Sequence, residues 1–311
     1  MTTQSIIRLA TRGSPLALWQ ANWVKAELER LHGCRLELLK IKTSGDKITD
    51  VPLAKIGGKG LFVKEIEEAL LAGRADLAVH SMKDVPVEIP KGLHIAVTTK
   101  REDPRDALIS AAGLPFAKLP QGAKIGTSSL RRGTQLRHKR PDLIVVPLRG
   151  NLDTRLRKLK SEQLDAVIVA AAGLCRMGWE GQVTEYLPVD ISLPAIGQGA
   201  LGLECRVDDA RIHRLIAPLN DRDTAVCVAA ERAFLTRLEG GCQVPIAGHA
   251  ELVGIELRLR GLVASLDGKQ LVVDEARGPI AQAAELGKGL AERLLDRGAG
   301  KILQEIYSSS K

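Results

Sequence analysis

Short apolar stretches alternate with amphipathic stretches through the first half of the chain. Residues 6–11 are apolar and lead into Ser14 and Pro15, a helix-capping residue followed by a proline suited to the first helical position. An apolar stripe at helical spacing then runs to about His32. Alternation of this kind predicts strands of an α/β sheet covered by helices. Further strands are predicted at 35–42, 75–81 and 93–100, and a helix at 61–73.

A second series of similar elements begins near residue 105. Residues 123–129 read as a strand running into a capped helix, and Asn151 caps a helix that follows the strand 143–149. Residues 164–171 form the next buried strand. The two series predict two α/β domains with a cleft between them.

The last ninety or so residues have a different pattern. A helix is predicted over 224–241, followed by strands at 255–265 and 270–276 that are joined by a turn containing Asp267 and Gly268. A final helix begins near Ile280. This pattern predicts a small α+β domain, which is joined to the rest through a Gly-Gly-Cys loop.

One segment holds the basic excess of the chain. The formal net charge is +8. Residues 124–160 contain eleven Lys and Arg and two acidic residues, a local charge of +9, so the remainder carries 34 basic and 35 acidic residues. An excess confined to one segment requires a local explanation.

Two arginines of this segment indicate an anion-binding site. Arg131 and Arg132 fall in the first turn of a predicted helix, where the helix dipole disfavours cations unless an anion also lies there. Arg12 stands in a similar place beside the helix that follows Ser14. A solvated helix face is the alternative for a run of charge. We expect small carboxylates or phosphates at these two helix N-termini.

Nucleic acid is the competing explanation of the basic segment. Proteins that bind single strands place aromatic side chains between their cations, because bases stack on them. This chain has three Trp, two Tyr and three Phe, and Phe116 is the aromatic residue nearest to the segment. The composition therefore disfavours a nucleic-acid partner.

Other function classes find little support in the sequence. The five cysteines are scattered and never spaced CxxC, which argues against a disulfide framework and a zinc site, so no metal is expected. The GQGALG stretch at 197–202 fits a dinucleotide motif but does not follow a strand and open a helix. Neither a membrane span nor a signal segment is found, and we expect a cytoplasmic protein.

Four stretches in order resemble the porphobilinogen deaminases, also called hydroxymethylbilane synthases. They are GGKGLFVKEIE (57–67), ADLAVHSMKDVP (75–86), GTSSLRRGTQL (126–136) and EGGCQVP (239–245). LRGN and LPAIGQGALGLECR lie between the last two, and ATRGSPLALWQ lies near the start. The resemblance covers essentially the whole chain.

The resemblance implies a defined chemistry and architecture. Enzymes of this family condense four porphobilinogen molecules head to tail with release of ammonia, giving hydroxymethylbilane, and prime the polymer with a dipyrromethane cofactor on a cysteine. The implied architecture is two periplasmic-binding-protein-like α/β domains with a cleft and a small α+β C-terminal domain. The implied domains are 1–99 with 200–217, then 100–199, then 218–311.

The resemblance also assigns roles to individual residues. Asp84 is implied as the catalytic acid, and Cys242 as the cysteine that holds dipyrromethane through a thioether. A carboxylate at that place would stabilise the cation formed as ammonia leaves and exchange the protons of the reaction. The implied cofactor-binding residues are Asp46, Ser81, Lys83, Asp84, Thr127, Ser129, Arg131, Arg132, Arg149 and Arg155. The implied substrate-binding residues are Arg12, Ser14, Lys55, Lys59, Phe62, Arg176 and Gln198.

The basic segment then matches the polyanion that these enzymes build. Each pyrrole carries an acetate and a propionate, so every addition brings two carboxylates that arginines can hold. Ser44 departs from relatives that carry an arginine before Gly45. The alternative function is a non-catalytic, two-lobed anion-binding protein, which would leave the Lys83-Asp84 pair and the Gly-Gly-Cys loop unexplained. A monomer is expected from the resemblance.

Overall fold

The structure is a computed structural model of the 311-residue chain and describes residues 6–47, 60–240 and 244–309, the side chains of Asp46, Lys47 and Ser309 excepted. The chain divides into two compact units, which we describe one at a time. Unit 1 comprises Met1–Asp50, Gly58–Arg101 and Ala200–Ala225, and unit 2 comprises Val51–Gly57, Glu102–Gly199 and Val226–Lys311.

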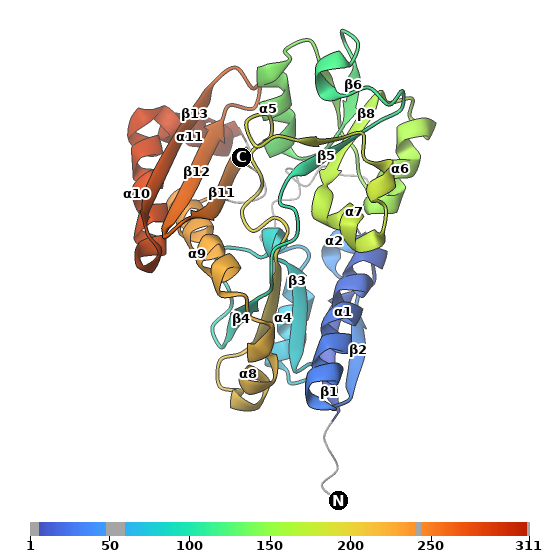
Figure 1. Ribbon diagram of the computed structural model, residues 1–311, viewed down its shortest axis with the longest axis vertical. Coiled ribbons are helices and arrows are strands. Elements are labelled where there is room, and N and C mark those ends of the chain that lie inside the picture. Colours follow the sequence, from blue (N-terminus) through green and yellow to red (C-terminus); the bar gives the residue numbers. More distant parts are fainter. Residues whose placement is uncertain (1–5, 48–59, 241–243, 310–311) are drawn as a thin grey trace, which may run out of the picture. The chain divides into compact units, whose positions relative to one another are not determined.

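Unit 1 is built on a five-stranded sheet of order β2-β1-β3-β10-β4 (Figure 1). The first three strands run parallel, whereas β10 is antiparallel to both of its neighbours. β10 enters the sheet from a part of the chain about a hundred residues beyond β4. The strands are β1 (Ile7–Arg12), β2 (Leu36–Ile41), β3 (Leu77–Ser81), β4 (Leu93–Thr98) and β10 (Leu201–Arg206).

Helices cover both faces of this sheet because its central strands are apolar on both sides. Leu9 and Leu77 belong to the core cluster that includes residues of α1 and α8, whereas their neighbours Ala10 and Ala78 belong to the cluster under α4. Adjacent residues of a strand point to opposite faces, so each pair serves two layers. The helices are α1 (Pro15–His32), α2 (Ser44–Lys47), α4 (Lys64–Leu71), η1 (Met82–Asp84), α8 (Ala210–Ile216) and η4 (Ala217–Leu219).

The first sheet of unit 2 repeats this plan in the order β7-β6-β8-β5-β9. β6 is parallel to β7 and β8, and β5 is antiparallel to β8 and β9. In both sheets, the fourth strand in this order is antiparallel to its two neighbours. The elements are β5 (Asp106–Ser110), η2 (Phe116–Lys118), β6 (Lys124–Gly126), α5 (Leu130–Lys139), β7 (Ile144–Val146), α6 (Leu152–Ser161), β8 (Ala166–Ala170), α7 (Ala171–Met177), η3 (Glu180–Gln182) and β9 (Glu185–Leu187).

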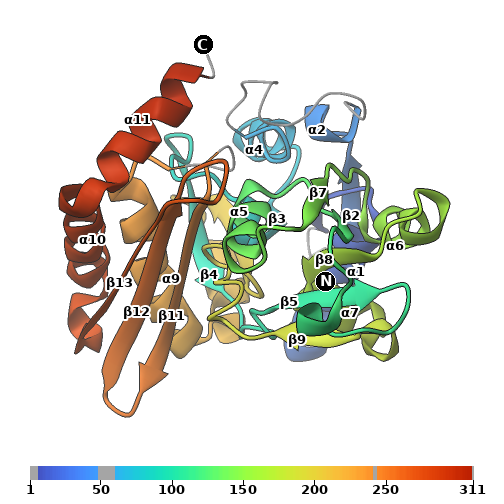
Figure 2. The ribbon, with the colours of Figure 1, turned by 90° about the horizontal axis from the view of Figure 1, so that it is seen from above.

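The C-terminal part of unit 2 is an antiparallel sheet of order β11-β12-β13, with α10 along one face (Figure 2). Gly261 on β12 lies under Phe234 of α9 and Leu290 of α10, where a Cβ would come within 3.0 Å of both side chains. Gly287 lets α10 approach the backbone of α9 at Ala230. The elements are α9 (Arg222–Arg237), β11 (Ile246–Val253), β12 (Glu256–Ala264), β13 (Leu271–Pro279), η5 (Ile280–Gln282), α10 (Ala283–Leu294), η6 (Leu295–Ala299) and α11 (Gly300–Ser309).

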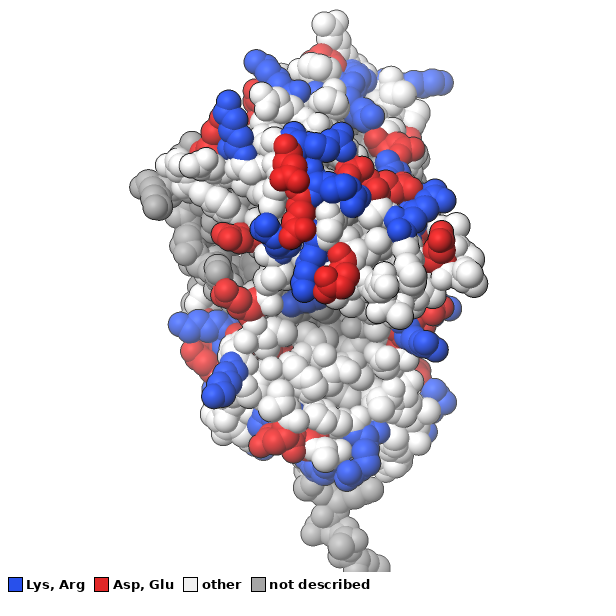
Figure 3. All heavy atoms as spheres, turned by 90° about the vertical axis from the view of Figure 1, so that its left-hand side faces the viewer, with Lys and Arg blue, Asp and Glu red and all other residues white. Residues whose placement is uncertain are grey.

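Basic and acidic side chains are interspersed on the face of the molecule drawn in Figure 3. In the C-terminal sheet domain, Arg258 pairs with Glu251 at 2.6 Å, and Arg293 of α10 pairs with Asp274 of β13 at 2.8 Å. Exposed pairs of this kind contribute about 0–1 kcal/mol each. They balance charge locally and leave no broad basic surface on the described part of that face.

The predicted fold class, α/β with a small α+β C-terminal domain, is confirmed. Ser14 caps α1 by accepting a hydrogen bond from the Ala17 N–H, and Asn151 caps α6, as the sequence predicted. The sequence analysis did not identify strands β5, β9 and β11. The exact domain boundaries and the cleft stay predictions. No helix among the described residues is long and apolar enough to cross a membrane.

Candidate functional site

The residues assigned to the site in unit 1 gather at one edge of its sheet. Arg12 ends β1 and Ser81 ends β3, and these two strands run parallel next to each other. The carboxyl ends of parallel strands meet at the same edge, which is where α/β proteins bind ligands. Ser14 and Asp84 follow directly on these two strands.

A pocket of about 90 Å³ opens at this edge. The Arg12 guanidinium carbon lies 4.2 Å from the centre of the Phe62 ring, and the Gln20 amide nitrogen donates to the Ser81 hydroxyl at 3.1 Å. A drug-sized ligand requires about 300 Å³ or more, so this pocket suits one ring or one acidic arm. The lining residues are Arg12, Ser14, Leu16, Ala17, Gln20, Phe62, Val63, Val79, His80, Ser81 and Asp84.

Asp84 contributes a carboxylate to the pocket. It is half-buried at the end of the short helix η1, which the Val85 N–H closes by donating to the Met82 carbonyl at 3.2 Å. Among the residues that the structure describes, none forms a hydrogen bond or ion pair with the Asp84 side chain. Its oxygens are therefore available to a ligand. Lys83 is also half-buried.

A buried acidic group lies behind the pocket. The His80 Nε2 atom is 2.8 Å from a carboxylate oxygen of Glu204, and both side chains are almost completely buried. Burial raises the pKa of Glu67 on α4 to about 7, and the nearby Glu204 carboxylate adds to the increase. Glu67 therefore retains a proton over much of the neutral pH range, which limits the negative charge buried behind the pocket.

The predicted anion site at the N-terminus of α5 already contains an anion. Asp106, completely buried on β5, pairs with Arg131 at 2.7 Å and with Arg132 at 2.8 Å. The two guanidinium groups hold the pKa of Asp106 far below its ordinary value, despite the opposing effect of burial. Ser129 caps the helix by accepting from the Arg132 N–H, and the Thr127 hydroxyl accepts from the Ser129 N–H. The trio of Asp106 and two arginines carries one net positive charge.

Gln198 belongs to the same buried network. Its amide nitrogen donates to Asp106 at 3.0 Å and to the Pro104 carbonyl at 2.6 Å, and its oxygen accepts from Arg131 and Arg132. The side chain has no exposed surface. In this conformation Gln198 fixes the arginines, and its predicted contact with substrate stays a prediction.

The other arginines of unit 2 lie at the corresponding edge of the second sheet. Arg149 and Arg155 follow β7, and Arg176 follows β8, which are the strands on either side of β6. The Arg155 Nε donates to the Gly150 carbonyl at 2.9 Å. Arg149 closely follows the carboxyl end of β7, whereas Arg155 lies on α6 and Arg176 near the end of α7.

Arg176 is a largely buried cation without an acidic partner in the described structure. Its guanidinium donates to the Gly199 carbonyl at 2.5 Å, and no described carboxylate oxygen lies within 4.0 Å. Burial lowers the pKa of Arg176 to about 10. A carboxylate brought by a ligand would offset this desolvation.

A second pocket in the described structure contains none of the predicted site residues. It has a volume of about 300 Å³ and lies between the end of α9 and α11 in unit 2. Three leucines line it together with polar side chains, among them Arg237, which pairs with Glu292. We favour the smaller pocket because it brings a carboxylate, an arginine and hydroxyl groups together.

Several predicted site residues lie outside the described residues. They are Lys55, Lys59 and Cys242, together with the side chain of Asp46. Ser44, the noted departure from the family pattern, donates its backbone N–H and its hydroxyl to Glu65 on α4.

The sequence analysis missed two features that the fold creates. The ion pairs of Asp106 could not be predicted from the sequence, because its partners Arg131 and Arg132 lie 25 and 26 residues further along the chain. His94, Cys205 and His213 come together in unit 1 without any metal-binding spacing in the sequence. Only the pairing of β4 with β10 could have indicated the second feature.

Comparison with known families gives two matches in sequence order. Residues 7–214 match the model of the porphobilinogen deaminase, dipyrromethane cofactor-binding domain, and residues 225–296 match that of the porphobilinogen deaminase C-terminal domain. The chain is 62% identical over 302 residues to a porphobilinogen deaminase of Geobacter metallireducens, covering 97% of this chain and 95% of that protein. It is 60% identical over 305 residues to one of Syntrophotalea carbinolica, covering 98% and 97%.

Solved structures show more distant similarity. A periplasmic substrate-binding protein of an ABC transporter from Coxiella burnetii aligns with a TM-score of 0.44 at 15% identity, over 73% of this chain and 96% of that one. The aliphatic sulphonate binding protein of Escherichia coli aligns with a TM-score of 0.41 at 15% identity, over 75% and 70%.

Proposed function

The chain belongs to the porphobilinogen deaminase family, and from that premise we propose that it joins four porphobilinogen molecules head to tail, releasing ammonia at each step, to give hydroxymethylbilane. The observation that carries the proposal is the unpartnered Asp84 carboxylate in a pocket with Arg12 and Ser81, within the described part of the chain. The alternative of a non-catalytic anion-binding protein is not favoured, because the family matches extend over both parts of the chain.

The donor groups of the chain suit a dipyrromethane cofactor. Two linked pyrroles carry four carboxylates, and the described site residues supply arginines and hydroxyl groups at the carboxyl edges of two sheets. Arg176 offers a desolvated cation that lacks a described acidic partner. When bound, the cofactor supplies the pyrrole carbon to which the first substrate is joined. Residues proposed to hold it are Asp46, Ser81, Lys83, Asp84, Thr127, Ser129, Arg131, Arg132, Arg149 and Arg155.

Asp84 is proposed to act on the incoming substrate. As ammonia leaves, positive charge develops on the aminomethyl carbon and the pyrrole ring, and a nearby carboxylate stabilises it. The same group can exchange the protons that accompany loss of the amine and loss of the ring hydrogen. Its position directly after β3, with no competing partner in the described structure, supports this role.

Arg12 and Ser14 are proposed to hold the acidic arms of the substrate. Arg12 lies over the Phe62 ring, which limits the orientations of the guanidinium group. Ser14 caps α1, where the helix N-terminus favours an anion. Lys55, Lys59, Phe62, Arg176 and Gln198 complete the proposed substrate-binding set.

Cys242 is proposed as the attachment point of the cofactor through a thioether, and this rests on the EGGCQVP motif. The intact mass of the purified protein should exceed the polypeptide mass by two pyrrole units. Cys242→Ser should lack this excess, whereas Cys175→Ser, a thiol on α7, should retain it. An unmodified protein that still turns over substrate would contradict the attachment.

Asp84→Ala is expected to retain the cofactor mass and to lose turnover by a factor of about 100–10,000, the usual contribution of a positioned acid or base. Ammonia release from porphobilinogen measures it. Asp153→Ala, at an exposed helix position of unit 2, is the control. A near-normal rate in Asp84→Ala would remove the assigned role. A cytoplasmic location and a monomeric state also belong to the proposal.

A further inference from the structure

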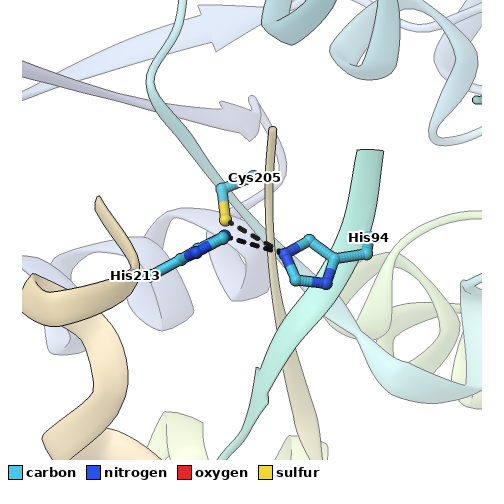
Figure 4. A group of neighbouring side chains, drawn as sticks. All are labelled: His94, Cys205 and His213. Carbon is cyan, nitrogen blue, oxygen red and sulfur yellow. Dashed lines mark hydrogen bonds between the residues drawn. The ribbon is translucent and has the colours of Figure 1, made fainter. Parts of the chain in front are cut away.

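Three side chains with metal-binding atoms meet in unit 1, as Figure 4 shows. The Nε2 atoms of His94 and His213 are 2.9 Å apart, and the Cys205 Sγ atom is 3.9 Å from the His94 Nε2. All three ligand atoms lie within 4.8 Å of one another. Imidazole nitrogen and thiolate sulfur are the usual ligands of Zn²⁺ in proteins.

The positions of β4, β10 and α8 bring these three side chains together. His94 on β4 and Cys205 on β10 are direct partners in the antiparallel register, so their side chains leave the sheet on the same face. His213 comes from α8, which packs on that face. Two strands and a helix therefore place the three groups, and none of them depends on a loop.

The separations suit a single tetrahedral ion. With Zn–N bonds of about 2.0–2.1 Å and Zn–S bonds of about 2.3 Å, ligand atoms at tetrahedral angles lie about 3.3–3.6 Å apart. The two separations that involve His94 lie on either side of these values, and movements of a few tenths of an ångström would bring those atoms to them. The third separation, between the Cys205 Sγ and His213, is at most 4.8 Å. Both histidines are half-buried, which leaves room for water as a fourth ligand.

A simple hydrogen bond between the two imidazoles is the competing explanation. One Nε2–H can donate to the other Nε2, and the edge-to-face rings, at an interplanar angle of 68°, allow it. In that explanation Cys205, which is completely buried, makes only a long sulfur hydrogen bond of 3.9 Å to the His94 Nε2. A cation would use all three groups at once.

We propose that His94, Cys205 and His213 form a binding site for one Zn²⁺ ion, separate from the residues assigned to catalysis. Binding forms two Zn–N bonds and one Zn–S bond, and the thiol proton of Cys205 leaves to solvent. The ion needs no oxidant or reductant.

Such an ion would join distant parts of the chain. His94 belongs to the stretch Gly58–Arg101 of unit 1, whereas Cys205 and His213 belong to the stretch Ala200–Ala225 that returns to it. β4 is an edge strand of the sheet, and the ion would fasten it to α8. Cross-links that close long loops stabilise most, so the site would serve stability rather than turnover.

Cobalt titration of the full-length protein with its cofactor attached, first stripped with a chelator, tests the site. One Co²⁺ per chain should give the visible bands of tetrahedral cobalt and a thiolate-to-metal charge-transfer band, which stoichiometric Zn²⁺ abolishes. Cys205→Ser should lose the charge-transfer band. His213→Gln should weaken binding more than about 100-fold, which exceeds the usual effect of changing a residue that only contacts a metal ligand. His32→Gln and Cys175→Ser, which alter a surface histidine and another thiol, should bind as the parent does.

Thermal unfolding supplies a second measurement. Zn²⁺ should raise the melting temperature of the parent protein and of both controls, and should leave that of His213→Gln unchanged. Weak binding shared equally by all variants, or octahedral cobalt spectra without a thiolate band, would overturn the site. Cofactor mass and ammonia release, measured on the same samples, test the proposed function independently.

Discussion

Replacing Asp106 by Asn should destabilise unit 2 strongly, because it removes the carboxylate that pairs with two buried arginines. Arg131 and Arg132 are 6% and 4% exposed, and Asp106 has no exposed surface. Asparagine has nearly the same shape, so the packing is preserved. Its amide nitrogen, however, would face guanidinium donors where Asp106 now accepts hydrogen bonds.

The magnitude follows from the burial of the group. Breaking a buried ion pair by removing one partner costs about 3–5 kcal/mol, since the remaining charge stays desolvated. For a body of 150–250 residues, each kcal/mol lowers the melting temperature by roughly 2–4 °C, so a decrease of roughly 6–20 °C is expected. Asp153→Asn disrupts only an exposed pair with Arg157 and should cost at most about 0.5 kcal/mol.

Urea and thermal unfolding, followed by circular dichroism, measure the difference. The pKa of Asp106 is lowered in the folded state, so its contribution is present above the unfolded value of 3.8 and is lost only as pH falls through the folded value. The difference in free energy of unfolding between parent and variant should therefore persist from pH 5 to pH 8. A variant within 1 kcal/mol of the parent would refute the reasoning, because the arginines would then not depend on this carboxylate.

Two further predictions concern single buried charges. Arg176→Gln should lower kcat/KM about 10–150-fold, which corresponds to the loss of one charge-assisted hydrogen bond of about 1.5–3 kcal/mol. The melting temperature should stay unchanged, because no described carboxylate loses a partner. A normal kcat/KM would show that Arg176 binds no carboxylate of the substrate. Glu67 has a folded pKa of about 7, above its ordinary value of 4.5, so ionisation of its buried carboxyl group destabilises the folded protein as the pH rises. Glu67→Gln removes that ionisation, so it should stabilise the protein above pH 7 by at most about 3 kcal/mol and have no effect below pH 4.5. Urea unfolding at pH 5 and pH 8 tests this, and an equal effect at both values would contradict it.

The family resemblance assigned Arg12 and Asp84 to the site, and the alternation of strands and helices explains why they lie in one pocket. That alternation gives parallel strands, and parallel strands bring the residues that follow them to one edge of the sheet. The capping residues Ser14 and Asn151 were also predictable, because capping is a local interaction.

The antiparallel fourth strands were harder to identify. β5 follows the polar stretch REDPRD, and its place between β8 and β9 depends on pairings about 60–80 residues apart. β10 enters the sheet of unit 1 after the whole second series of elements. No local pattern specifies such a crossing, and the residues that these strands carry, Asp106 and Cys205, were missed for the same reason.

The sequence correctly predicted an anion beside the arginines at the start of α5, but the anion there is a side chain of the protein itself. Two arginines in the first turn of a helix do require a nearby negative charge, and the fold supplies Asp106 from its own β5. One carboxylate cannot neutralise two guanidinium groups, so the trio keeps one positive charge beside the helix N-terminus. The dipole of α5 disfavours that residual charge, and an external carboxylate would stabilise it. Asp106 thus fixes the orientation of both arginines at the start of α5.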